Sequence, residues 1–245
     1  MNGKFHFLHR IFGASFLALT LTTAVAAEQY CEPWQPPAPP APVAAAPDPS
    51  PAAPATKPAP RWVPTAFKPR AFEGIGPPLI FLGDSLTESI TASAPELQYP
   101  ALTAGPRAFT VYAAGGQSST VLASLFKQVE LPADAIVVIW IGRNNFRDSA
   151  AVLADVAETV RQIGDRRFLV LSIIQGRYYS ELPGKEGAQA VIELNTLLGQ
   201  AYPDNFVTVG DDLLCSDRVD AIHLTDAGQL KIARAVQAAL VARGW

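Results

Sequence analysis

The sequence predicts an α/β domain of three layers, in which a central, mostly parallel five-stranded sheet lies between two layers of helices. Five short apolar runs, rich in β-branched residues, occupy residues 79–82, 109–113, 135–141, 168–174 and 206–209. Runs that are apolar throughout, rather than at alternate positions, are typical of strands buried on both faces of a parallel sheet. Helical patterns lie between the runs, and alternating strands and helices indicate an open sheet covered on both faces.

The individual elements follow in order along the chain. The first run ends at Gly83, the second at the pair Gly115 and Gly116, and the third at Gly142. A helix is expected next, because apolar residues recur at helical spacing; they are Val152, Val156, Val160 and Ile163. The fifth run is the weakest strand. The last helix is expected after Thr225, whose hydroxyl is suited to an N-cap.

The chain divides into three parts, which we expect to be a signal peptide (1–27), a linker rich in proline and alanine (28–70) and one domain (71–245). A short cationic start is followed by an uncharged segment, 11–27, that ends in small residues of the kind a signal peptidase accepts. The alternative is an uncleaved anchor, although seventeen apolar residues are short for a membrane span. Cleavage would place the protein in the periplasm or outside the cell, without stable insertion in the membrane.

Thirteen of the 22 prolines lie between residues 33 and 64. Proline fixes φ and removes a backbone donor, so this segment is expected to favour extended polyproline II rather than a helix or sheet. Two interpretations stay open. The segment is either a leader without a partner or a spacer that contacts the envelope or cell wall.

Composition excludes some functions and narrows the chemistry. No basic block stands out and the net charge is −3, which argues against nucleic acid as a partner. Of three histidines, two leave with the leader, so any general-base histidine must be His223. With so few histidines and cysteines we expect no metal site. Cys31 and Cys215 can pair in an oxidising compartment; a buried Cys215 and a Cys31 that pairs between chains are the alternatives.

Candidate chemistry gathers where the predicted strands end, because ligands of open α/β sheets bind at the carboxyl ends of the strands. Ser85 follows the first strand, and a serine needs a base within hydrogen-bond reach to act as a nucleophile. Backbone N–H groups of the glycine pair and the side chain of Asn144 are suited to an oxyanion hole. Asp220, three residues before His223, is suited to orient the imidazole.

Four segments resemble, in order, the conserved blocks of SGNH (GDSL-like) hydrolases: Gly-Asp-Ser-Leu at 83–86, the glycine pair at 115–116, Gly-Arg-Asn-Asn at 142–145 and Asp-Ala-Ile-His-Leu-Thr at 220–225. The resemblance implies a flavodoxin-like fold and a serine esterase without cofactors. It implies these roles: nucleophile and oxyanion donor for Ser85, further oxyanion donors for Gly116 and Asn144, general base for His223 and orienting acid for Asp220.

Two departures from the family's pattern concern local support rather than reaction type. The family often has aspartate where this chain has Asn145, and asparagine shortly before the glycine pair, where this chain has Tyr112-Ala113-Ala114. The segment after the fourth strand carries Arg177 and Tyr178, which we expect, together with Arg143, to line the substrate groove.

The expected function is that of an exported serine ester hydrolase that removes acetyl or other short acyl groups from a polysaccharide or envelope polymer through an acyl-enzyme. Three alternatives stay open. Two use the same residues, as a lipid or short-chain acyl esterase or as an O-acetyltransferase. The third is a carbohydrate-binding module without activity.

Overall fold

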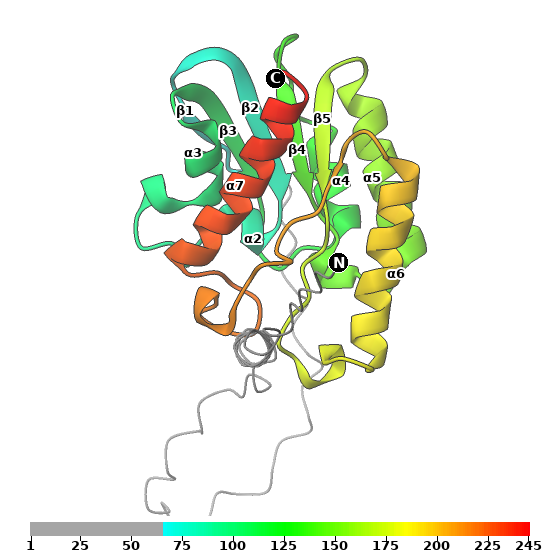
Figure 1. The fold of residues 1–245 in the computed structure, drawn as a ribbon. Coiled ribbons are helices and arrows are strands. Elements are labelled where there is room, and N and C mark those ends of the chain that lie inside the picture. Colours follow the sequence, from blue (N-terminus) through cyan, green and yellow to red (C-terminus); the bar gives the residue numbers. More distant parts are fainter. Residues whose placement is uncertain (1–65) are drawn as a thin grey trace, which may run out of the picture.

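A sheet in the order β1-β3-β2-β4-β5-β6 forms the centre of the computed structural model, which describes residues 66–245 (Figure 1). The predicted leader, and the predicted linker up to residue 65, lie outside the described residues. Neighbouring strands are parallel except for β1 and β3. The strands are β1 (Arg70–Phe72), β2 (Ile75–Gly83), β3 (Arg107–Ala113), β4 (Ile136–Trp140), β5 (Arg167–Leu171) and β6 (Phe206–Val207).

Two strands differ from the sequence-based expectation of five. The short edge strand β1 was missed, because three residues cannot form an apolar run; Phe72 holds it by stacking on Phe109, with ring centroids 4.3 Å apart. The predicted fifth strand, β6, contains only the first two residues of its run. At Val209 the backbone bonds to a side chain instead of to a neighbouring strand. The Ser172 hydroxyl accepts from the Val209 N–H at 2.9 Å and donates to the Val209 carbonyl at 3.1 Å.

Helices cover both faces of the sheet, which confirms the predicted three layers. One face carries α2 (Ser85–Glu88), α3 (Tyr99–Ala104) and α7 (Asp226–Ala242), and the other carries α4 (Ser119–Phe126), α5 (Ser149–Ile163) and α6 (Glu186–Ala201). In Figure 1, α7 crosses in front of the sheet. Within residues 66–245 no helix has both the length and the apolar character needed to cross a membrane.

The alternation of side chains along β2 shows why its run is apolar throughout. Leu79 and Phe81 enter the core beneath α7, whereas Ile80 and Leu82 enter the core on the opposite face. All four are at most 3% exposed. A strand buried on both sides needs apolar residues at every position, as the sequence has.

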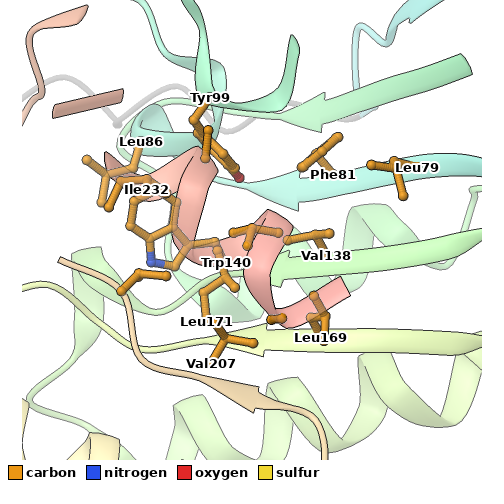
Figure 2. Packing of buried hydrophobic residues seen from close by; sticks show 14 of the residues in the cluster. Leu79, Phe81, Leu86, Tyr99, Val138, Trp140, Leu169, Leu171, Val207 and Ile232 are labelled. Carbon is orange, nitrogen blue, oxygen red and sulfur yellow. The ribbon is translucent and has the colours of Figure 1, made fainter. Parts of the chain in front are cut away.

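Trp140 occupies the centre of the core beneath α7 (Figure 2). It is 1% exposed, and its ring meets that of Tyr99 edge to face, with centroids 5.3 Å apart. Its indole N–H donates to the carbonyl of Ser172 at 2.9 Å. Trp140 thus links β4 to the residue that follows β5 by a buried hydrogen bond.

Replacing Trp140 by phenylalanine should lower the free energy of unfolding by at least about 1–3 kcal/mol, because the buried Ser172 carbonyl loses its donor. Replacement by alanine should cost roughly 3–5 kcal/mol, since a cavity is added. Chemical denaturation measures both. As a control, Val241→Ala on the exposed side of α7, where Val241 is 77% exposed, should stay within about 0.5 kcal/mol of the parent. A Trp140→Phe protein as stable as the parent would contradict this account.

Candidate active site

The register of the sheet brings the predicted site segments together. Gly83 at the end of β2 pairs with Ala113 of β3 and with Trp140 of β4. The segments that follow these three strands therefore leave the same edge side by side. They carry Ser85, the glycine pair and Asn144, so three of the four blocks meet through strand register alone.

The turn that carries Ser85 is built on a close approach at Gly83. A Cβ at Gly83 would lie 1.9 Å from the Thr87 hydroxyl and 2.8 Å from the Trp140 carbonyl, so only glycine fits. Asp84 caps α2 by accepting from the Leu86 N–H at 3.0 Å. Ser85 is the first residue of α2 and is half-buried.

Ser85, His223 and Asp220 form a continuous hydrogen-bonded chain. The Ser85 Oγ lies 3.0 Å from His223 Nε2, and His223 Nδ1 lies 2.7 Å from Asp220 Oδ2. An ionised carboxylate only accepts, so Nδ1 carries the proton of a neutral imidazole and Nε2 is left to accept from the serine. This is the arrangement in which histidine can remove the serine proton.

The environment of Asp220 favours its charged form. Burial by itself would raise its pKa, but the hydrogen bond from the His223 ring and those from the N–H groups of Ile222 and His223 together lower it. The two backbone bonds, at 2.8 and 2.7 Å, hold the carboxylate in place. Asp220 is therefore suited to stabilise an imidazolium.

Asn144 lies at the turn that carries Ser85, and its amide forms two hydrogen bonds. Its Nδ2 donates to Asp84 Oδ2 at 3.1 Å and to the Gln117 carbonyl at 3.0 Å. A side-chain amide has two N–H donors, so both are occupied in this state. An oxyanion that formed at Ser85 would have to take over one of them.

The glycine pair adjoins the serine. A Cβ on Gly115 would lie 2.8 Å from Glu88 Oε2, so this carboxylate would have to shift, and 3.7 Å from the Ser85 Cβ, which is an ordinary contact distance. Gly116 has a φ of +69°, a conformation that side chains rarely adopt. The assignment of the oxyanion N–H to Gly116 rather than Gly115 stays a prediction.

The three predicted groove residues differ in exposure and contacts. Arg143 is 7% exposed and forms an ion pair of 2.7 Å with buried Glu181, with its guanidinium over the rings of Phe146 and Tyr178. Arg177 ties its loop to the His223 loop, because its backbone N–H donates to the Ala221 carbonyl at 2.8 Å. Tyr178 is 40% exposed and lies within electrostatic range of Asp220, so it is at the site and open to solvent.

Two further groups support the site, and sequence reasoning missed the first of them, Glu181. Glu181 accepts from Arg143 and from the Gly176 N–H at 2.7 Å, and a charged residue in a loop gives no sequence signal of burial. The second is Asn145, which stands where the family often has aspartate. Its side chain accepts from the Ser119 N–H and donates to the Ser119 hydroxyl, both at 3.0 Å. The same hydroxyl donates to Asp155 at 2.6 Å. Asn145 therefore supports the segment that follows the glycine pair.

The electrostatics of the turn centre on Asp84, which is 1% exposed. Burial raises the pKa of its carboxyl to about 6, although the Leu86 N–H and the charges of Arg143 and His223 act in the opposite direction. Burial disfavours the charged form of any carboxyl group. Among residues 66–245 no group of three or more His, Cys, Asp or Glu side chains is arranged to hold a metal ion.

The raised pKa of Asp84 predicts a specific pH dependence of stability. The folded protein binds this proton more tightly than the unfolded chain, so the contribution is fully present below pH 3.8 and is lost as the pH rises through about 6. The free energy of unfolding of the parent minus that of Asp84→Asn should therefore rise by roughly 2 kcal/mol between pH 8 and pH 4. Urea denaturation across this range measures it, and parallel pH curves for the two proteins would show that the pKa is not raised.

Cys215 is disulfide-bonded. The sequence has one further cysteine, Cys31, which lies outside the described residues.

Comparison with known proteins identifies the fold. No family model matches the sequence, and no curated protein matches it. Solved structures do. A lipolytic G-D-S-L family protein of Veillonella parvula matches with a TM-score of 0.55 and 15% identity over 68% of this chain and 97% of its own. A family two carbohydrate esterase of Cellvibrio japonicus matches with a TM-score of 0.51 and 16% identity over 73% and 62%.

A third match is the catalytic domain of the peptidoglycan O-acetyltransferase OatA of Streptococcus pneumoniae, with a TM-score of 0.50 and 15% identity over 70% of this chain and 96% of its own. At these identities the likeness concerns the fold. The resemblance noted in the sequence is confirmed at that level, and residues 66–245 have an SGNH hydrolase-like fold.

Proposed function

We propose that this protein is a serine ester hydrolase in which Ser85, His223 and Asp220 form the catalytic triad. The observation that carries the proposal is their continuous chain, with Oγ–Nε2 and Nδ1–Oδ2 distances of 3.0 and 2.7 Å. The chain lies at the carboxyl edge of the sheet, where open α/β folds place their chemistry.

The reaction proceeds in two half-reactions. Ser85 Oγ attacks the ester carbonyl while His223 Nε2 takes the hydroxyl proton; the C–O bond to the alcohol then breaks, and the imidazolium returns the proton to the departing alkoxide. Water repeats the attack on the acyl-enzyme with His223 again as base, which releases the acid and restores Ser85. Asp220 holds the imidazole and stabilises its charged form.

The carbonyl oxygen becomes negative in each half-reaction and needs donors. The backbone N–H groups of Ser85 and Gly116 and the Asn144 amide are the donors that we propose. Asn144 would exchange its bond to the Gln117 carbonyl for one to the oxyanion, because its other bond, to the buried Asp84 carboxylate, is charge-assisted and stronger.

We propose acetyl or other short acyl groups on a polysaccharide or envelope polymer as the substrate. Two of the structural neighbours support this choice, because one is a carbohydrate esterase and the other is a peptidoglycan O-acetyltransferase. Transfer to a sugar hydroxyl differs from hydrolysis only in the acceptor, so O-acetyl transfer is the second candidate. Tyr178 and Arg177 are the proposed contacts for the sugar; Arg143 was expected to join them, but it is buried against Glu181 and supports the Tyr178 ring from behind. The predicted signal peptide at 1–27 and the predicted linker at 28–70 support our proposal of a periplasmic or secreted location.

Variants of the triad test the mechanism with p-nitrophenyl acetate. Ser85→Ala and His223→Ala should each abolish turnover, because nucleophile and base act as one unit. Asn144→Ala should lower kcat by roughly 10²–10³, the usual cost of one oxyanion donor. The exposed Ser216→Ala is the matched control and should turn over like the parent. Normal rates in a folded Ser85→Ala protein would end the proposal.

A chain-length series of p-nitrophenyl esters tests the acyl preference. We expect kcat/KM to be highest for acetyl and to fall steeply beyond butyryl, since the loop at 175–187 is polar and charged. A long acyl chain would need a continuous apolar lining, in which each buried CH₂ contributes roughly 0.8 kcal/mol. Higher kcat/KM for octanoyl than for acetyl would replace the deacetylase assignment by a lipid esterase.

A further inference from the structure

A cavity of about 740 Å³ lies beside the proposed triad, at the carboxyl edge of β5 and β6. Its walls are the segment 173–177, the first half of α6 and the loop that leads from Val209 to Arg218. None of the three triad residues lines it. Its volume falls in the range of about 300–1,000 Å³ that small-molecule sites occupy.

The cavity and the triad share their backbone supports. Arg218 lines the cavity and also pairs with Leu224 in the β-bridge that closes the His223 loop. Arg177, in the segment 173–177, also lines it, and its N–H donates to the Ala221 carbonyl within the same loop. The cavity wall is therefore joined to the loop that carries His223 through both arginines.

Arg218 brings a positive charge to the cavity wall. Its Nη1 is buried without a hydrogen-bond partner among the described residues. The two nearby carboxylates are engaged elsewhere: Glu181 accepts from Arg143 and the Gly176 N–H, and Asp217 accepts from Lys231 and the Leu214 N–H.

Further cations surround Arg218. Burial lowers its pKa to about 10, and Arg143 and Arg177 add to the effect, although Glu181 and Asp217 oppose it. Of the remaining charged wall residues, Glu186 pairs with Arg147 at 2.9 Å and is almost fully exposed, and Lys185 donates to the Tyr179 hydroxyl at 3.0 Å. Asp211 is an acidic residue in the same wall segment, 209–218, as Arg218.

We propose that the cavity binds a carboxylate carried by the sugar polymer next to the esterified residue, with Arg218 as the principal contact. A guanidinium presents a planar fork of donors that fits a carboxylate in two parallel hydrogen bonds. The substrate class is therefore an acidic, uronate-type polysaccharide. This inference rests on the proposed function and narrows its substrate.

Kinetics with a matched pair of substrates test the proposal. The pair is an O-acetylated oligogalacturonide and its carboxyl-reduced, neutral counterpart, and the measured quantity is the ratio of their kcat/KM values. The parent should favour the acidic substrate. Arg218→Gln should lower the ratio about tenfold to a hundredfold, mainly through KM, since a charge-assisted hydrogen bond is lost. Arg218→Lys should retain part of the preference.

Arg234→Gln, an exposed arginine of α7, is the matched control and should leave the ratio unchanged. Because the ratio compares two substrates in one protein, any general effect of Arg218→Gln on the His223 loop cancels. A parent without preference for the acidic substrate, or an unchanged ratio in Arg218→Gln, would overturn the proposal.

Calorimetric binding of unacetylated oligogalacturonide separates this inference from the proposed function, because it needs no catalysis. Binding by the parent that weakens at least tenfold in Arg218→Gln would support the anion site even if p-nitrophenyl acetate is not hydrolysed. Hydrolysis of that ester without Arg218-dependent binding would keep the esterase and remove the anion site.

Discussion

The register that aligns Gly83 with Ala113 and Trp140 is the constraint on which the site depends. It sets the ends of β2, β3 and β4 level, so that the segments after them meet at one edge. Trp140 helps to hold this alignment, because it packs on Tyr99 and bonds to the end of β5. A slip of one residue would reverse which face each side chain enters, and burial on both faces makes that slip costly.

Buried polar groups then orient the side chains that the register brings together. Asp84 accepts from Asn144 and also caps α2, and Glu181 pairs with Arg143, the residue that precedes Asn144. Such groups cost free energy through desolvation, and the raised pKa of Asp84 is the visible sign of this cost. In return each charge has defined partners, and the site is positioned before any substrate arrives.

Much of the site could be predicted because its signals are local. A run such as 135–141 indicates a buried strand by itself, and a serine or histidine in a short motif retains its meaning wherever the chain places it. Glu181 could not be predicted, because its burial is created by segments distant in sequence. β1 was missed for a similar reason, since it is held by its pairing with β3 and by the stacking of Phe72 on Phe109, both of which join segments distant in sequence. The engagement of both Asn144 donors likewise depends on where Asp84 and Gln117 lie.

The sequence by itself determined the layered α/β architecture, the parallel core strands and the identity of the residues at their ends. Hydrophobic period and residue type carry that information, because each strand must be apolar on every face it buries. Only the tertiary structure decided that His223 reaches Ser85 across 138 positions, that Arg143 is buried against Glu181, and that Arg218 faces a cavity. These features depend on distances between segments far apart in the chain, which packing and strand order set and which no local pattern encodes.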